Sequence, residues 1–191
     1  MINHNDFIKI DLDYDIKITA REMTNKLLQV IKDKKGSLFN TDEEQNRYYG
    51  FLGELAIQKF FSENNIYFIT DDVIGKSDKY DILINNKKID VKTASRKNNI
   101  KELFNDNYDF FIAEQQVNNN HADYYVQVII NKEYAYIIGF IDNKKVKDYP
   151  LKKTVNMVNT AYSIPINELF SMNELLIKLR GKNGQTKRII H

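Results

Sequence analysis

The chain has no cysteine and no tryptophan among its 191 residues, and it has only two prolines and seven glycines. Without cysteine it can form neither a disulfide framework nor a thiolate metal site, so a reducing compartment is the default expectation. Three scattered histidines, His4, His121 and His191, argue against a histidine-rich zinc site. The composition therefore turns attention to carboxylates and lysines as the groups that carry chemistry.

Long apolar runs are also missing from this sequence. No segment approaches the length of a membrane-spanning helix, and the first residues lack the basic start and apolar stretch of a signal peptide. We therefore expect a cytoplasmic protein without a membrane partner. The formal net charge of +2 is too small to indicate nucleic-acid binding by itself. The length predicts a single domain over residues 1–191.

Periodicity and capping patterns predict an α/β fold, with a central mixed sheet flanked by N-terminal helices and a C-terminal helix. Capping boxes at Thr19 and Thr41 open the first two helices. The stretch 108–116 fits either a strand or a helix. The predicted helices cover 19–36, 41–61 and 167–180, and the predicted strands cover 66–70, 81–84, 87–94, 123–130, 133–141 and a short piece ending at Ile164.

The most specific pattern is a β-hairpin that carries two carboxylates. Apolar and polar residues alternate on both sides of Asn85-Asn86, a pair that tolerates the left-handed backbone of a two-residue turn. Counting outward from that turn places Asp81 opposite Asp90 on one face, and Lys92 joins them there. The isoleucines and Val91 fall on the other face, which is the expected core side.

Two ionised carboxylates at that separation repel by roughly 3 kcal/mol at an effective dielectric of about 20. A hard cation such as Mg²⁺ between Asp81 and Asp90 removes this repulsion, because one or two carboxylates plus waters and phosphates are its usual ligands. Lys92 would then lie beside a metal-bound water and act on it rather than on the fold. The alternative is a solvated polar face in which Lys88 and Lys92 offset the acids.

The second predicted helix contains Gly50-Phe51-Leu52-Gly53-Glu54. Each glycine costs about 1 kcal/mol against alanine in a helix interior. Their missing side chains favour close packing against a neighbouring element. Glu54 lies within this apolar stretch and needs either solvent or a partner. On its own it fits an exposed stripe, whereas together with the hairpin it fits a site.

In kind and order, Glu54, Asp81 and Asp90-Val91-Lys92 resemble the PD-(D/E)XK nuclease superfamily. Its pattern is a helix glutamate, an aspartate on a strand, and Asp/Glu-x-Lys on the partner strand. The resemblance covers roughly 47–141 and implies a restriction endonuclease-like core over about 41–141, with an extension over 142–191. It also implies that Asp81, Asp90 and the Val91 carbonyl hold Mg²⁺ or Mn²⁺, that Lys92 positions or deprotonates water, and that Glu54 supports the metal through water.

The expected function is a magnesium-dependent endonuclease that hydrolyses DNA phosphodiester bonds, acting as a possible homodimer. Alternatives are a junction-resolving or RNA-directed nuclease, and a catalytically silent nucleic-acid-binding module of the same fold. No Gln-x-x-x-Tyr element follows the lysine, which argues against the exonuclease branch. His121 reads as a surface residue. The residues expected to contact phosphates flank the hairpin: Lys76, Lys79, Arg96 and Lys97.

Overall fold

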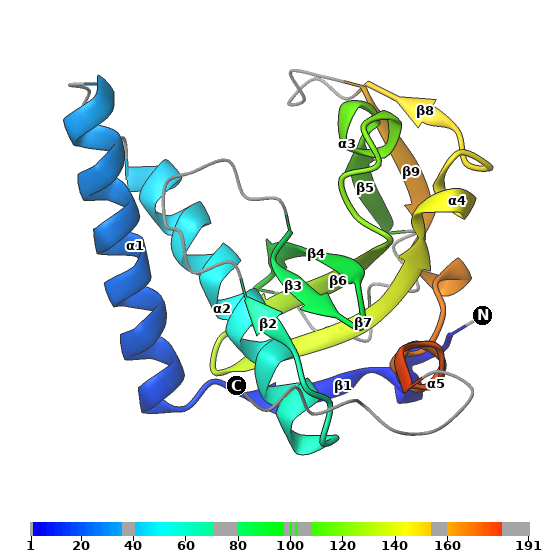
Figure 1. The fold of residues 1–191 in the computed structure, drawn as a ribbon, viewed down its shortest axis with the longest axis horizontal. Helices are drawn as coiled ribbons and strands as arrows, with labels where there is room; N and C mark the ends of the chain where they lie inside the picture. Colours follow the sequence, from blue (N-terminus) through cyan, green and yellow to red (C-terminus); the bar gives the residue numbers. More distant parts are fainter. Residues whose placement is uncertain are drawn as a thin grey trace.

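A computed structural model describes residues 2–35, 41–70, 80–97, 100, 102, 108–153 and 160–180. It shows a mixed α/β protein in which helices flank a curled mixed sheet (Figure 1). None of the helices in these ranges combines the length and the apolar character needed to span a bilayer.

The large sheet has six strands in the order β1-β7-β6-β4-β3-β2. All its neighbouring strands are antiparallel except β4 and β6, which run parallel. A second, antiparallel sheet has the order β5-β9-β8. The strands are β1 (Ile8–Asp11), β2 (Ile69–Thr70), β3 (Ile82–Ile84), β4 (Lys87–Ser95), β5 (Asp109–Ala113), β6 (Tyr124–Asn131), β7 (Tyr134–Asp142), β8 (Leu151–Lys152) and β9 (Ala161–Pro165).

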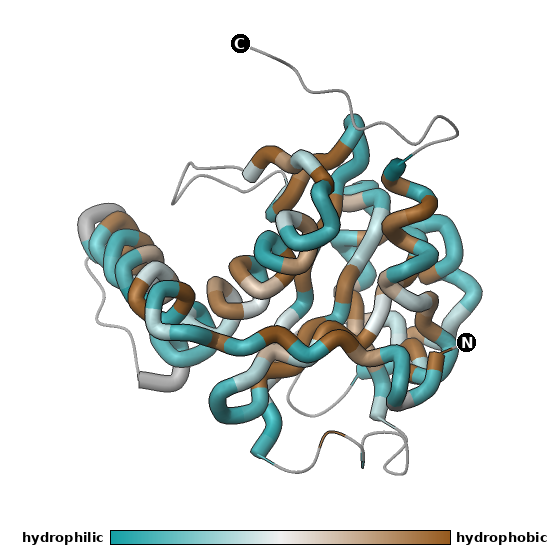
Figure 2. Tube along the Cα trace, turned by 90° about the horizontal axis from the view of Figure 1, so that it is seen from below, coloured by the Kyte–Doolittle hydropathy of each residue, from teal (hydrophilic) through white to brown (hydrophobic). Residues whose placement is uncertain are grey.

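Two apolar clusters lie on opposite faces of the large sheet. On one face, α2 (Thr41–Glu63) and α5 (Met172–Arg180) pack against β3, β4, β6 and β7. On the other face, the small sheet packs together with α3 (Glu114–Asn118) and α4 (Asn143–Val146). Apolar segments accordingly follow the strands in the middle of the molecule, whereas much of its margin is hydrophilic (Figure 2). The sheet is thus buried on both faces.

Helix α1 (Tyr14–Lys35) lies outside α2, and the two helices run side by side in opposite directions (Figure 1). It begins five residues before the predicted capping box at Thr19. The reason is Asp13, whose Oδ1 accepts a hydrogen bond from the Ile16 N–H at 3.0 Å and so caps the first turn. The prediction of the α1 start was therefore wrong, while the long second helix is confirmed.

Other helix and strand boundaries differ from the predicted ones where the local sequence pattern was ambiguous. The segment 108–116 divides into strand β5 and the start of α3. The hairpin between β6 and β7 turns at Lys132-Glu133, with φ +54° at Lys132, one residue later than predicted. The C-terminal helix starts at Met172, because Ile166–Glu168 forms a separate 3₁₀ turn. Strand β2 is confined to two residues, and β1 was not predicted.

Candidate active site

The β3–β4 hairpin has the predicted register and turn. Ile84 pairs with Lys87, and Asn85 and Asn86 have φ values of +48° and +62°. Positive φ at both turn residues is the conformation that matches the right-handed twist of the flanking strands. The Asn85 side-chain amide also donates to the Leu179 carbonyl at 2.8 Å, which fastens the turn to α5. The hairpin is therefore a fixed platform.

Asp81 occupies a bend immediately before β3. Its N–H donates to the Ile89 carbonyl at 3.2 Å, and its Oδ2 accepts a hydrogen bond from the Val91 N–H at 2.6 Å. The paired ladder ends at Ile82 and Ile89, so Asp81 and Asp90 are not a ladder pair as predicted. Because β3 stops short of Val91, the Asp81 carboxylate takes the place of a strand partner at this edge.

The Val91 carbonyl points to the edge where the Asp81 carboxylate lies. In a β-strand the N–H and C=O of one residue project to the same side. The Val91 N–H meets Asp81, whereas the neighbouring Lys92 carbonyl points to β6 and accepts a hydrogen bond from Gln127 Nε2 at 3.0 Å. This edge therefore presents a main-chain carbonyl beside a carboxylate, which is the placement that the family resemblance implies for a metal ligand.

Asp90 is buried, with 3 % of its surface exposed. Lys92 Nζ lies 2.5 Å from its Oδ2, and His121 Nε2 lies 3.6 Å from its Oδ1. The Lys92 ammonium group balances the charge but does not approach in a hydrogen-bonding direction, so Oδ2 has no hydrogen bond among the described residues. Asp90 Oδ2 is therefore held by an ion pair, and a carboxylate oxygen has a second lone pair that a further partner can use.

Strand β6 completes a group of side chains that we call the Asp90 cluster: Asp90, Lys92, His121, Tyr125 and Gln127. The parallel register places Tyr125 beside Asp90 and Gln127 beside Lys92. The Tyr125 hydroxyl is buried and has no hydrogen bond within the described part of the chain. Burial first, and the charge of Asp90 second, raise the pKa of Tyr125. Tyr125 therefore remains a protonated phenol at neutral pH.

Asp123 holds the start of β6 against the start of β4. Its carboxylate accepts hydrogen bonds from the Lys88 N–H and from Lys87 Nζ, each at 2.9 Å, and its N–H donates to the Lys88 carbonyl at 2.8 Å. Burial alone would raise the pKa of Asp123, but the Lys88 N–H and the Lys87 ammonium outweigh it and lower that pKa. These bonds hold the segment in which His121, two residues before Asp123, lies beside Asp90.

Glu54 reaches the sheet from the other side. Its neighbour Gly53 packs so closely on β4 that an added Cβ would lie 2.0 Å from Thr93 Oγ1. Thr93 faces α2, whereas Asp90 and Lys92 point to the opposite face. Among the described side chains, no three His, Cys, Asp or Glu residues form a ligand group. Asp81 and Asp90 thus meet on the same stretch of β4, while Glu54 lies on α2, the helix that packs on Thr93.

The predicted phosphate contacts lie at the C-terminal end of β4. Arg96 and Lys97 are exposed, and the Arg96 guanidinium lies 4.5 Å from the centre of the Tyr108 ring. Lys76 and Lys79 fall outside the residues that the structure describes.

Sequence reasoning missed His121, Tyr125 and Gln127. We predicted His121 on the surface, but 29 % of its side chain is exposed and it contacts Asp90. The asparagine-rich run before it resembles a solvated loop. Only the parallel pairing of β4 with β6, about 35 residues apart in the chain, brings these side chains to Asp90. No local pattern reveals that pairing.

In comparisons with known proteins, no family model, curated protein or solved structure matches this chain.

The oxygen groups at this edge fit a magnesium ion. Mg²⁺ usually binds one or two protein carboxylates and completes its shell with waters and substrate phosphates, so a third acid is not required. Asp81 and Asp90 supply carboxylates, Val91 supplies a carbonyl, and Asp90 Oδ2 has an unused hydrogen-bonding position. Lys92 already balances one of the two negative charges. The candidate site therefore presents oxygen donors of the kind that divalent cations bind.

Proposed function

We propose that this chain is a magnesium-dependent endonuclease that hydrolyses DNA phosphodiester bonds. The observation that carries the proposal is the Asp81 carboxylate bound to the Val91 N–H, next to the buried Asp90–Lys92 pair. Two carboxylates, a carbonyl and a lysine thus gather where β3 begins. The Asp-x-Lys strand β4 in a mixed sheet, with helix α2 packed on it, further supports a restriction endonuclease-like core.

When bound, a divalent cation would neutralise the phosphate and lower the pKa of a bound water. Asp81 and Asp90 would hold that cation with the Val91 carbonyl. The cation and the Lys92 ammonium group would compete for the charge of the same buried Asp90 carboxylate, so a bound cation would weaken the Asp90–Lys92 ion pair. The Lys92 side chain, 28 % exposed, can then turn toward the substrate. There its ammonium group would orient the attacking water, and it would take up a proton from that water only after losing one of its own protons to solvent.

His121 and Tyr125 add polar contacts around Asp90. His121 Nε2 lies near the carboxylate oxygen that Lys92 does not contact. It would hold the orientation of Asp90 when Lys92 moves away. The protonated Tyr125 hydroxyl is a buried donor on the same face of the sheet. We assign both to positioning Asp90.

A second candidate is a nucleic-acid-binding module without turnover. The observation in its favour is the direct Asp90–Lys92 pair, which satisfies the charge of each partner without a metal. In that case the acids and the lysine stabilise the hairpin, and the basic end of β4 binds the nucleic acid. This candidate predicts binding that is indifferent to magnesium.

The decisive experiment incubates the purified protein with duplex, single-stranded and four-way-junction DNA and with RNA, in Mg²⁺, Mn²⁺ or chelator. We expect metal-dependent cleavage that Asp90→Asn abolishes and that Asp15→Asn, a charge removal at an exposed position on α1, leaves intact. The preferred substrate separates a DNA endonuclease from a junction-resolving or RNA-directed enzyme. Absence of cleavage on every substrate would refute the proposal.

Metal binding has a readout that does not depend on activity. At ten times its dissociation constant, Mg²⁺ should stabilise the wild type by about 1.4 kcal/mol through mass action. Asp90→Asn should lose most of this gain, and Asp15→Asn should keep it. Thermal melts with Mg²⁺ and with chelator measure both. Identical melts of the wild type in the two conditions would favour the binding module.

A further inference from the structure

A basic pocket lies where the parallel strands β4 and β6 end. It encloses about 380 Å³. Its lining comes from α2, from the end of β4, from the end of β6 and from the following turn: Tyr49, Ser95, Arg96, Lys97, Ile130 and Lys132. The carboxyl ends of adjacent parallel strands are a frequent place for ligands in α/β sheets. This pocket is separate from the Asp90 cluster, which lies further back along β4.

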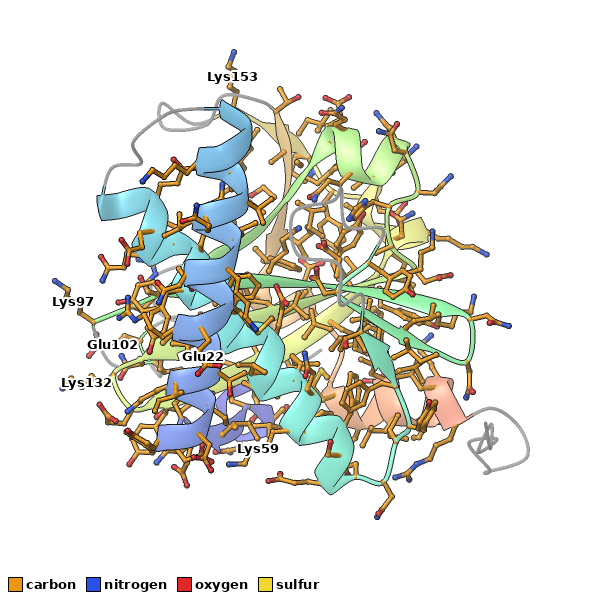
Figure 3. The ribbon with its side chains drawn as sticks, turned by 60° about the vertical axis from the view of Figure 1, so that its left-hand side comes forward. Glu22, Lys59, Lys97, Glu102, Lys132 and Lys153 are labelled. Carbon is orange, nitrogen blue, oxygen red and sulfur yellow. The ribbon has the colours of Figure 1, made fainter. Side chains whose placement is uncertain are left out.

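The pocket carries three positive charges and no carboxylate in its lining. Within the described ranges, none of Arg96, Lys97 and Lys132 forms an ion pair. Lys97 and Lys132 extend from the same side of the molecule, where Glu102 also lies (Figure 3). Three cations around one pocket whose lining holds no acid favour an anionic ligand.

The backbone around the pocket is held in place. Ser95 pairs with Ile130, and the Arg96 N–H donates to the Ile130 carbonyl at 2.9 Å. The Asn131 side-chain amide in turn donates to the Arg96 carbonyl at 2.8 Å. These bonds lock the end of β4 to the end of β6, so the cations project from fixed positions. A preformed arrangement loses less entropy when a ligand binds.

Tyr49 adds an aromatic wall. Its hydroxyl accepts a hydrogen bond from Gln45 Nε2 at 3.0 Å, and its ring is half-buried on α2. Aromatic rings beside cationic groups are typical of nucleic-acid sites, because bases stack on the ring while the cations bind phosphates. The volume of the pocket suits a nucleotide rather than a bare phosphate ion.

We infer that this pocket binds one nucleotide of the substrate strand, with its phosphate on Lys97 and Lys132 and its base against Tyr49. The inference rests on the proposed nuclease function. From Val91 or Asp90 to Ser95, β4 spans about 13 to 16 Å at roughly 3.3 Å per residue. Tyr49 and Ser95 place the pocket on the α2 face, whereas Asp90 and Lys92 point to the opposite face, so a strand that occupies both sites would pass around the end of the sheet.

The test measures DNA affinity by fluorescence anisotropy in chelator over a range of salt concentrations, so that no cleavage occurs. The pocket variant is Lys97→Gln/Lys132→Gln. The matched control, Lys144→Gln/Lys147→Gln, removes two exposed charges around α4, outside the pocket. We expect the pocket variant to bind about tenfold more weakly and to reduce the slope of log K against log salt by about 2. The control should change both much less.

Substitutions of Tyr49 test the contribution of base stacking to DNA affinity separately from that of the positive charges. Tyr49→Ala should weaken binding several-fold, and Tyr49→Phe should keep wild-type affinity, because the ring and not the hydroxyl contacts the base. Thermal melts verify that each variant is folded. If the pocket and control pairs lose the same affinity, or if Tyr49→Ala binds like the wild type, the pocket assignment is overturned.

Cleavage measured over a range of DNA concentrations separates this inference from the proposed function. The pocket variant Lys97→Gln/Lys132→Gln should need about tenfold more DNA for half-maximal cleavage, whereas the control Lys144→Gln/Lys147→Gln should cleave like the wild type. If the wild type cleaves and the pocket variant binds more weakly, both assignments are supported. If the wild type never cleaves but the pocket variant binds more weakly, only the pocket is supported. If the wild type cleaves and the pocket variant binds with unchanged affinity, only the nuclease is supported.

Discussion

The pairing of Lys92 with Asp90 gives the sharpest test of the site. From the sequence we expected Lys92 to act on water and not on the fold, and we expected the two aspartates to repel each other. The structure instead places Lys92 Nζ 2.5 Å from a carboxylate whose side chain is 5 % exposed. Lys92→Met keeps the length of the side chain and removes the charge. It leaves Asp90 buried without its ammonium partner, while His121 Nε2 stays 3.6 Å from the carboxylate.

The cost of Lys92→Met depends on two opposing free energies, the Coulomb attraction within the ion pair and the desolvation of its two charges. At a separation of 2.5 Å the Coulomb attraction is about 7 kcal/mol at an effective dielectric of about 20. Desolvation of the two charges offsets most of this attraction, and breaking a buried pair typically costs about 3 to 5 kcal/mol. The partial exposure of Lys92 and the proximity of His121 reduce the penalty. We therefore expect Lys92→Met to destabilise the protein by about 2 to 3 kcal/mol.

Asp90→Asn should cost less, about 1 kcal/mol, because Lys92 can then turn to solvent. In the double variant the two losses should not add, and the coupling energy should be about 1.5 to 2 kcal/mol.

Urea unfolding at pH 7 in chelator measures this cycle, with circular dichroism as the signal because the chain has no tryptophan. The matched control is Lys87→Met, which breaks the pair with Asp123, where both side chains are substantially exposed. Its cost should stay near or below 1 kcal/mol. If Lys92→Met is as stable as the wild type, or if the two substitutions add, the buried pair does not exist as described.

Gly53→Ala should destabilise the protein by about 1 to 3 kcal/mol, because its Cβ would lie 2.0 Å from Thr93 Oγ1. Gly50→Ala, with nothing described within 4 Å of its Cβ, should stabilise it by up to about 1 kcal/mol, and equal urea midpoints would contradict the packing. Asp123 has a lowered pKa, so its contribution to stability is present above the unfolded value of about 3.9 and is lost as pH falls through the folded value. Acid unfolding of Asp123→Asn should accordingly be shallower below pH 4 than that of the wild type. His121→Ala should lower the cleavage rate more than His121→Gln, because glutamine can still donate to Asp90, and equal rates would remove His121 from the site.

Local sequence determined the parts of this protein that depend on alternation and turn chemistry. The Asn85-Asn86 turn, the faces of β4 and the long second helix all follow from residues close together in the chain. Side-chain period and left-handed turn propensity are properties of short segments, so they can be read without knowing the rest of the fold. The same holds for Gly53, whose missing side chain signalled a close contact.

Tertiary structure decided which groups meet. Asp81 turns to the Val91 N–H because β3 begins only at Ile82, and that boundary depends on how far the whole sheet pairs. His121 reaches Asp90 only through the parallel pairing of β4 with β6. Burial of both faces of the large sheet selects this pairing, and the second sheet that covers one face draws on segments about 50 residues apart. Such contacts depend on the free energy of the complete core, which cannot be read from any short segment.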